Sequence, residues 1–369
     1  MKRYAWLFPV LGALLSGGCS GESGVYFDQR DGISWQRDQW NAAGQELLQR
    51  TDPQARSEVL SAIDAAFAAA EWPLKDGQRW TAEQNGKKVQ AEYHLIEEGP
   101  FWEISREWHR TGAQEEERVK SLSIPLKGSL SITKEGKKMA DISLDLQGTD
   151  ADKNGILGLE DELTLNAEIL AADFSLILAP CRLTGGEASF ICVFSAVSGQ
   201  LVRYAVQTRG LRADSTEKTL EDPYWDESWR YEDVRLDADA LEMEADYPGG
   251  IHIRGWVESR KLRDILARFN SLLTEEETGA LAVEASSCLH LGWYYENDLE
   301  KSRATMTVRP KHILNRYDDY WTWEYGVLCN DGLSCSVSEF FSGSRFQDFR
   351  SDFQDFSRHL QYLRPYLLP

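Results

Sequence analysis

The chain has 369 residues, of which 42% are hydrophobic, so it can build sizeable cores, and its length suggests two or three domains. Its 60 acidic residues outnumber 40 basic ones, which gives a formal net charge of −20 at pH 7. Such a surface repels phosphate backbones and argues against nucleic acid as a partner. The acidity indicates solubility and self-repulsion, and a preference for cations or basic partners is the alternative.

The first residues have the features of an export signal. Lys2 and Arg3 give a positively charged start, residues 5–15 form an apolar run, and small residues follow at 16–18. The run is too short to cross a bilayer as a helix. A buried N-terminal helix, the alternative, would not explain the small residues that follow the run. Residues 1–18 are therefore predicted to be a signal peptide, and the protein to be exported.

The end of this signal resembles the lipobox of bacterial lipoproteins. Residues 15–19 read LSGGC, and the resemblance makes Cys19 the residue that is lipidated. Ser16 departs from the usual pattern, which leaves cleavage by the ordinary signal peptidase as an alternative. The resemblance implies a lipid anchor in the outer membrane, since Ser20 after the cysteine is typical of such Gram-negative lipoproteins; otherwise the protein is periplasmic or secreted. Acyl chains of this kind hold a protein on a membrane durably.

Residues 19–33 are expected to be a linker, and residues 34–115 to hold a helix followed by strands. The helix is predicted over 56–71, where apolar residues recur at helical spacing. Asp52 can cap it and Pro53 suits its first turn. The aromatic-rich strand pattern then follows.

Residues 116–213 alternate between apolar and polar side chains, as in the stretch 141–146, DISLDL. A period of two with one polar face is typical of half-buried antiparallel strands. We therefore predict an α+β protein with a central antiparallel β-meander over about 116–213, flanked by aromatic-rich strand and helix segments. The apolar face of the meander must be covered by a second sheet or by helices.

Within the meander, residues 150–161 read DADKNGILGLED and resemble an EF-hand or dockerin-type calcium loop. Such a loop supplies oxygen ligands from positions 1, 3, 5, 7, 9 and 12 and has glycine at position 6, which is Gly155 here. The resemblance implies Ca²⁺ as a cofactor, bound by Asp150, Asp152, Asn154, the carbonyl of Ile156, Gly158 through water, and Asp161.

The calcium-like loop departs from the EF-hand pattern in three ways. Asp161 stands where glutamate is usual, the loop occurs once, and a strand pattern precedes it instead of a helix. The residues at and after its end, 160–174, fit either a strand or a helix. A polar turn between two strands is the alternative. We hypothesise one structural calcium ion, because an ion would offset the repulsion among the clustered carboxylates.

Five cysteines lie beyond the export signal, and four of them form two pairs. Cys181 and Cys192 flank a glycine-rich turn, and Cys329 and Cys335 bracket Asn-Asp-Gly, so each pair could face across a hairpin. Exported proteins can form disulfides, and we predict both pairs to be bonded. Cys288 is expected to be a small buried hydrophobe, with an intermolecular bridge as the alternative. These spacings do not resemble a zinc site.

The last segment, 214–369, is expected to mix helices and aromatic strands. A helix is predicted over 260–273, and Thr274 with Glu277 forms a capping box for another. Aromatic strands are expected around 289–298 and 320–329. A final amphipathic helix carries the stripe Phe346, Phe349, Phe353, Phe356, Leu360 and Leu363. The stripe could dock on a partner, but core packing is the commoner use of such a pattern.

Catalytic motifs are lacking, because the chain has no nucleophile elbow, Walker loop or dinucleotide fingerprint. Cys288 and His290 would face the same way on a strand, but no carboxylate that orients the histidine can be identified. Asp226 and Glu227 lie among aromatic residues that suit glycoside hydrolysis or sugar stacking, although hydrolysis needs a defined carboxylate separation. No catalytic residue is predicted.

We therefore predict an exported, lipid-anchored envelope protein with a non-catalytic binding or structural role. Its expected partners are the membrane, through the anchor, and a glycan or another envelope protein. Two alternatives stay open: a secreted glycan or peptidoglycan hydrolase, and a carrier whose meander cups an apolar ligand. A carboxylate pair in a cleft would indicate the hydrolase, a roomy apolar site the carrier, and an exposed aromatic strip the binding module.

Overall fold

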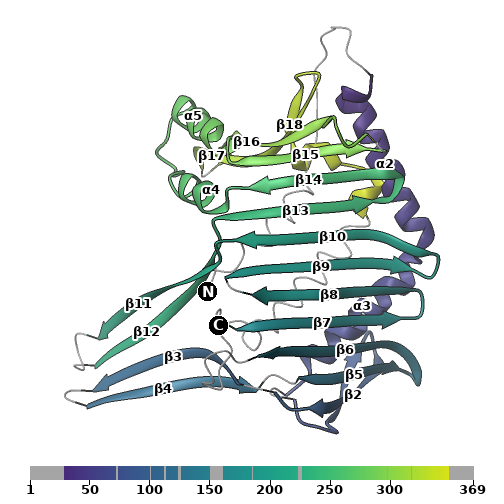
Figure 1. Cartoon of the computed structure of the whole chain (residues 1–369), viewed down its shortest axis with the longest axis vertical. Coiled ribbons are helices and arrows are strands. Elements are labelled where there is room, and N and C mark those ends of the chain that lie inside the picture. The colour runs from purple at the N-terminus through teal and green to yellow at the C-terminus, as the bar shows by residue number, and fades with distance from the viewer. Residues whose placement is uncertain are drawn as a thin grey trace. The chain divides into compact units, whose positions relative to one another are not determined.

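The structure is a computed structural model of the chain (Figure 1). It describes residues 29–71, 74–99, 101–111, 114–123, 126–149, 161–184, 186–222, 227–296, 298–316 and 318–348. Within residues 101–123 and 213–236 only the backbone is described. The predicted signal peptide and Cys19 lie outside the described residues.

Strands dominate the described residues, and they form one antiparallel sheet of fourteen strands and one of four. In hydrogen-bonded order, the large sheet comprises β1 (Arg79–Gln84), β2 (Lys87–Glu97), β5 (Lys127–Lys134), β6 (Lys137–Thr149), β7 (Glu162–Ala171), β8 (Phe174–Thr184), β9 (Glu187–Ala196), β10 (Gly199–Arg209), β13 (Ala240–Tyr247), β14 (Ile251–Val257), β15 (Leu289–Tyr295), β16 (Ala304–Leu314), β17 (Asp319–Cys329) and β18 (Ser334–Ser336). The small sheet comprises β11 (Arg212–Asp222), β12 (Glu227–Asp237), β3 (Phe101–Thr111) and β4 (Gln114–Ser123).

The described residues also form several helices. They are η1 (Gln29–Asp31), α2 (Ile33–Arg50), α3 (Pro53–Ala68), η2 (Pro248–Gly250), α4 (Ser259–Leu266), α5 (Glu275–Ser286) and α6 (Val337–Phe341). None of the helices in the described ranges is long and apolar enough to cross a membrane.

The predicted α+β class and the central meander are confirmed, because β5 to β10 are consecutive neighbours in the large sheet. The predicted stretch 116–213 also includes most of β4 and the first residues of β11, which belong to the small sheet instead. The backbone register of the small sheet explains why these strands are separate from the meander. Glu227–Tyr231 of β12 pairs with Glu107–Thr111 of β3, so the β11–β12 hairpin and the β3–β4 hairpin hydrogen-bond to each other. The stretch 160–174, which fitted a strand or a helix, contains strand β7, which lies between β6 and β8.

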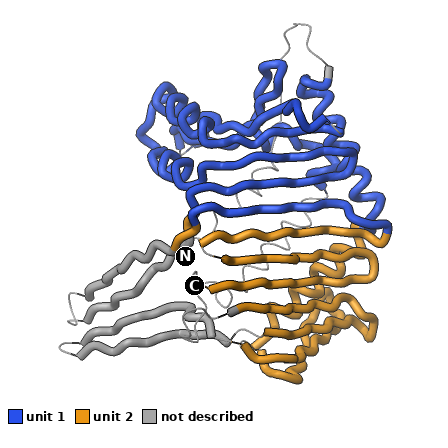
Figure 2. The backbone as a smooth tube through the Cα atoms, in the orientation of Figure 1, with its two compact units in different colours: residues 1–52, 198–210, 238–352 blue, residues 53–197, 211–237, 353–369 orange. Residues whose placement is uncertain are grey.

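The chain forms two compact units, each discontinuous in sequence (Figure 2). Unit 1 comprises residues 1–52, 198–210 and 238–352, and unit 2 comprises residues 53–197, 211–237 and 353–369. The divisions predicted from the sequence are contiguous stretches, so they differ from both units in their boundaries.

The core of unit 1 lies where α2 packs on β14 and α6 packs on β17. Trp40 of α2 is 1% exposed and meets Tyr247, Trp293 and Phe341 edge to face, with ring centroids 4.8, 5.5 and 5.1 Å away. A methyl group at Gly44 would lie 2.1 Å from the backbone nitrogen of Phe346, so only glycine permits this approach.

The core of unit 2 lies under α3, which contacts β1, β2, β5 and β6. Ile63 of α3 and Val89 and Ile132 of the sheet are completely buried. This helix confirms the prediction over 56–71. Pro53 opens the helix, as its fixed φ and missing N–H favour.

Helices α4 and α5 of unit 1 occur where the sequence predicts them. The capping box before α5 is confirmed: Glu277 N–H donates to the Thr274 hydroxyl (3.3 Å), and Thr274 N–H donates to the Glu277 carboxylate (2.9 Å). Helix α4 ends at Leu266, earlier than the predicted 273. In the turn that follows, the Asn270 side-chain oxygen accepts a hydrogen bond from the Leu272 N–H (3.0 Å).

Candidate functional site

Four neighbouring strands of unit 2, β6 to β9, place apolar residues on the same side of the sheet. The register shows this directly, since Leu144 lies opposite Ala167, which lies opposite Leu178, which lies opposite Cys192. We call this set the meander face. It comprises Ile142, Leu144, Leu146, Leu163, Leu165, Ala167, Ile169, Phe174, Leu176, Leu178, Cys181, Phe190, Cys192 and Phe194.

The meander face is only half-buried. Its central side chains, such as Leu165, Leu178 and Phe190, are neither buried nor fully exposed, as are almost all their neighbours in β7, β8 and β9. Phe174 and Phe194, whose rings are 5.8 Å apart, are buried at one end of the strands. The other side of β6 to β9 carries mostly polar residues. The meander face is thus a continuous apolar surface with incomplete cover.

Two predicted disulfide partners, Cys181 and Cys192, lie on the meander face. A bulge after Leu178 shifts the register, so Cys192 faces Leu178 while Cys181 faces Phe190. Both thiols are free in the structure. Burial raises the pKa of both, that of Cys192 to about 11, which disfavours the reactive thiolate. The bond between them stays a prediction.

The other predicted pair, Cys329 and Cys335, is buried at the end of β17 and in β18. Cys335 lies directly opposite Val327, so it is the diagonal neighbour of Cys329 on the same side of the sheet. Diagonal Cα atoms are about 7–8 Å apart, at the limit of what a disulfide can bridge. This pairing also stays a prediction.

Cys288 and His290 lie in different surroundings, because the thiol is buried and the imidazole is exposed. Cys288 is completely buried after α5, and this burial raises its thiol pKa. His290 is exposed; its ring stacks on Trp256 at 4.6 Å, and its Nε2 lies 3.2 Å from the Glu258 carboxylate. The carboxylate that sequence reasoning could not identify is therefore Glu258, which precedes α4. The buried thiol is unsuited to act as its nucleophile.

A charged depression of about 490 Å³ lies beside α4 and α5 in unit 1. Its lining residues are Asp239, Glu258, Arg260, Lys261, Asp264, Ile265, Arg268 and Glu284. Its carboxylates have basic partners: Arg268 lies 2.8 Å from Glu284 and Lys261 lies 3.1 Å from Glu258. Hydrogen bonds from His290 and Lys261 lower the pKa of Glu258. A glycosidase acid needs a raised pKa, so these charges do not favour hydrolysis.

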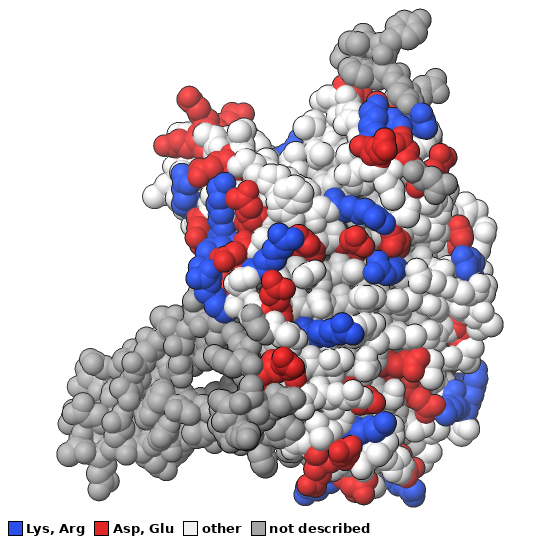
Figure 3. Space-filling view, in the orientation of Figure 1, with Lys and Arg blue, Asp and Glu red and all other residues white. Residues whose placement is uncertain are grey.

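Strands β10, β13 and β14 of unit 1 carry an ion pair and a hydrogen bond between side chains of neighbouring strands. Arg203 of β10 lies 3.4 Å from Glu244 of β13, and His252 of β14 lies 2.6 Å from Asp246. Figure 3 shows acidic and basic side chains interspersed across this view of the molecule. Interspersed charge of this kind keeps a strand surface soluble without forming a field of one sign.

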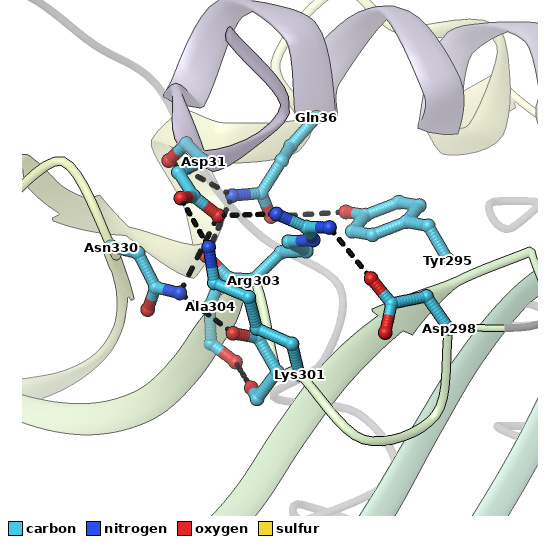
Figure 4. A network of polar contacts seen from close by, with 9 residues as sticks. Asp31, Gln36, Tyr295, Asp298, Lys301, Arg303, Ala304 and Asn330 are labelled. Atoms are coloured by element: carbon cyan, nitrogen blue, oxygen red, sulfur yellow. Dashed lines mark hydrogen bonds and ion pairs between the residues drawn. The ribbon is translucent and has the colours of Figure 1, made fainter. Parts of the chain in front are cut away.

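A buried polar network fixes the start of α2 in unit 1 (Figure 4). Asp31 accepts hydrogen bonds from Arg303 (3.0 Å) and Lys301 (2.7 Å), and Arg303 also donates to Asp298 (2.7 Å). Gln36 donates to the Arg303 carbonyl (3.0 Å) and accepts from the Tyr295 hydroxyl; Asn330 completes the ring. The members satisfy one another, which is typical of a structural network.

The pKa of Asp31 follows from these contacts. Burial acts to raise it, but hydrogen bonds from Lys301 and Arg303 outweigh burial and hold the pKa below its ordinary value. Sequence reasoning missed this network and placed Asp31 in a linker. The partners lie about 270 positions away along the chain, and no local pattern joins them.

The predicted calcium ligands lie outside the described residues, with the exception of Asp161. That side chain is 2% exposed and directly precedes β7. Thr149 pairs with Glu162, so residues 150–161 connect two adjacent antiparallel strands, as both the calcium loop and the polar turn require. Among the side chains that the structure describes, no group of three His, Cys, Asp or Glu residues is arranged to hold a metal.

The aromatic stretch around Asp226 is described only in part. Asp226 lies outside the described residues, while Glu227 begins β12 opposite Thr111. The backbone register places Trp229 opposite His109.

Comparisons with models of protein families, with curated proteins and with solved structures found no match for this chain.

Proposed function

We propose that the protein is an exported, lipid-anchored binding protein of the cell envelope that holds an apolar ligand on its meander face. The observation that carries the proposal is the half-burial of that face over the three adjacent strands β7, β8 and β9. Soluble proteins rarely leave large continuous apolar surfaces incompletely covered unless a partner or ligand uses them.

The chemistry of the meander face indicates the class of ligand. Its side chains are aliphatic, phenylalanine or cysteine, and none is charged. A surface of this kind offers dispersion contacts and removal of water, but no partner for a polar head group. We therefore propose a long unbranched hydrocarbon chain, such as the acyl chain of a lipid, as the ligand. A binding role of this kind needs no catalytic group.

The test is the affinity for a fluorescent fatty-acyl probe. Leu165→Gln with Leu178→Gln places amides on the meander face and should weaken binding about tenfold, because each loses buried methylene contacts worth about 0.8 kcal/mol apiece. Thr164→Gln with Ser175→Gln introduces the same two amides on the polar side and should leave the affinity unchanged. Equal affinities in both double variants, or no saturable binding by the wild type, would contradict the proposal.

Lipidation at Cys19 and a structural Ca²⁺ ion complete the proposal. The lipobox-like residues support the first, and the oxygen-rich loop before the buried Asp161 supports the second. Mass spectrometry of the mature protein tests the anchor: the expected N-terminal residue is an acylated Cys19. A mature chain that begins at an unmodified residue would rule out the anchor and leave export by the ordinary route.

A further inference from the structure

We propose that unit 1 carries a binding site for neutral glycans, formed by the exposed indole of Trp256 and the charged depression beside α4 and α5. The site uses no residue of the meander face. It therefore stands independently of the proposed function and adds a second class of ligand.

The aromatic part of the site is the stacked pair of Trp256 and His290. Trp256 of β14 lies directly opposite His290 of β15, and their rings are 4.6 Å apart and 25° from parallel. Trp256 is 48% exposed, and it is the one exposed tryptophan among those whose side-chain burial the structure describes. A single exposed aromatic side chain would need no explanation by itself. The surroundings of this ring are what point to a ligand.

The stacked pair is held in a fixed orientation. Gly255 has a φ of 141°, and a methyl group there would clash with the carbonyl oxygen of His290, so glycine is needed for this close approach of β14 to β15. Nε2 of His290 lies 3.2 Å from the carboxylate of Glu258, two residues after Trp256. The stack and the hydrogen bond orient the imidazole before any ligand arrives. A preformed surface of this kind lowers the entropic cost of binding.

Glu258 joins the aromatic pair to the polar part of the site, because it also lines the depression of about 490 Å³. That volume lies within the range of small-molecule sites, about 300–1,000 Å³. On the opposite side of Trp256, Glu242 of β13 lies across from the indole and pairs with Arg209 of β10. The ring therefore has carboxylate and basic groups on both neighbouring sides. Figure 3 shows acidic and basic side chains close together over α4 and α5.

The charges of the depression favour a neutral polyol over an ion. Four carboxylates face three basic groups, and they pair with each other, as Arg260 does with Asp239 at 3.3 Å. Such pairs concentrate no charge of one sign for a phosphate or a metal ion. A sugar hydroxyl both donates and accepts hydrogen bonds, so it can bridge a carboxylate and a guanidinium.

The exposed indole adds a requirement that sugar rings meet. A pyranose ring has an apolar face of C–H groups, which can pack on the face of a tryptophan. The hydrogen bonds that lower the pKa of Glu258 keep its carboxylate ionised, and an ionised carboxylate is a strong acceptor for hydroxyl groups. The same low pKa does not suit a glycosidase acid, so the site binds a glycan without cleaving it.

The aromatic part is tested with fluorescently labelled cellotetraose, chitotetraose and maltotetraose. The wild type should bind at least one of them saturably. Trp256→Ala should weaken that binding about tenfold, whereas Trp256→Phe, which keeps a smaller ring, should lose less. No saturable binding of any of the three sugars, or wild-type affinity in Trp256→Ala, would overturn the proposal.

A second stacked pair in unit 1 supplies a matched control. Trp321 of β17 stacks on His312 of β16 at 4.6 Å, and Nε2 of His312 lies 2.8 Å from Asp319. The arrangement repeats that of Trp256, His290 and Glu258, but Asp319 does not line the depression. Trp321→Ala should therefore bind the sugar as the wild type does. A loss of affinity in Trp321→Ala without one in Trp256→Ala would overturn the proposed location.

The polar part is tested with Glu258→Gln, which keeps the shape of the side chain and removes its charge. It should weaken sugar binding about fivefold, since a charge-assisted hydrogen bond becomes a neutral one. Glu324→Gln is the matched control, because Glu324 also pairs with a lysine, Lys311 at 2.9 Å, outside the depression. Equal affinities in these two variants would contradict the role of the depression.

Two measurements separate a lost site from a lost fold and from the proposed function. Cys288 is completely buried, and its backbone carbonyl accepts a hydrogen bond from the Glu258 N–H, so its protection from a maleimide reports that this part of unit 1 is folded. If Trp256→Ala exposes Cys288, Trp256→Phe decides, and its wild-type affinity would then overturn the stacking. Leu165→Gln with Leu178→Gln should bind the sugar normally, whatever its affinity for the acyl probe. A loss of sugar binding in that variant would contradict a site confined to unit 1.

Discussion

Two regions of the sheet have the same alternating pattern but different cover. In β14 and β15 of unit 1, Ile253, Leu291 and Trp293 are at most 1% exposed. On the meander face of unit 2, Leu165 and Leu178 remain half-buried. The strand pattern thus specifies which side of a sheet is apolar, whereas the degree of burial depends on what packs on that side.

The cover in unit 1 is built mainly from aromatic rings. Trp40 of α2 and the α6 residues Phe340 and Phe341 pack around Trp293, with Phe340 4.9 Å from it edge to face. Edge-to-face pairs add to the free energy gained from burial alone. Aliphatic side chains predominate on the meander face, so its contacts are less specific in geometry.

The largest expected difference between the two regions is in the cost of truncation. Trp40→Ala should lower the free energy of unfolding by about 3–5 kcal/mol, because it leaves a cavity among buried rings. Leu165→Ala should cost about 1–2 kcal/mol, at or below the usual range for a buried leucine, because the side chain keeps partial access to solvent. Denaturant unfolding measures both, and equal costs would mean that the meander face is packed as tightly as the unit 1 core.

A second difference concerns pH, because unit 1 is held partly by a buried carboxylate. The folded-state pKa of Asp31 is lowered, so its contribution to stability is complete above its ordinary value of 3.8 and is lost as the pH falls through the folded pKa. Asp31→Asn should destabilise the protein by about 3 kcal/mol at neutral pH, since it removes one of the two carboxylates that pair with the buried Arg303 and leaves only Asp298.

The measurement is the stability of unit 1 between pH 6 and pH 2, followed by the emission of its buried tryptophans. The variant should lose less stability than the wild type below pH 4. A wild type and variant with parallel pH profiles would show that Asp31 carries no such linkage.

The smallest effect is expected at the loop before β7, and it should be confined to unit 2. Calcium at 100 times its dissociation constant stabilises a folded protein by about 2.7 kcal/mol. Asp150→Ala with Asp152→Ala should remove the calcium-dependent rise in Tm. The absence of any rise in the wild type at millimolar calcium, or an equal rise in the variant, would favour the polar turn.

Local patterns predicted the local features well. The alternation over β6 to β10 and the capping box of Thr274 and Glu277 depend on neighbours in sequence, and both are confirmed. Helix α2 was not singled out, although its buried residues Gln36, Trp40, Ala43 and Leu47 recur at three and four positions. Glycine and polar residues dilute that stripe, so its apolar signal is weak.

Features that depend on distant partners could not be predicted. The bulge that sets Cys181 and Cys192 out of register arises inside β8, and the spacing of the cysteines does not reveal it. The contact between Glu258 and His290 joins residues 32 positions apart across neighbouring strands. The inclusion of Asp31 in the core likewise requires Arg303, because a lone buried carboxylate would be too costly.

The Asp31 network also determines how the protein would respond to tension. If Cys19 is anchored in a membrane, the residues from there to Gln29 reach about 35 Å at full extension. A pull on this tether arrives at Asp31, whose ion pairs hold it to Lys301 and Arg303 between β15 and β16. The load would therefore pass into the sheet and largely bypass α2. Under that condition the ion pairs of Asp31 would protect the start of α2 from being unwound by the pull.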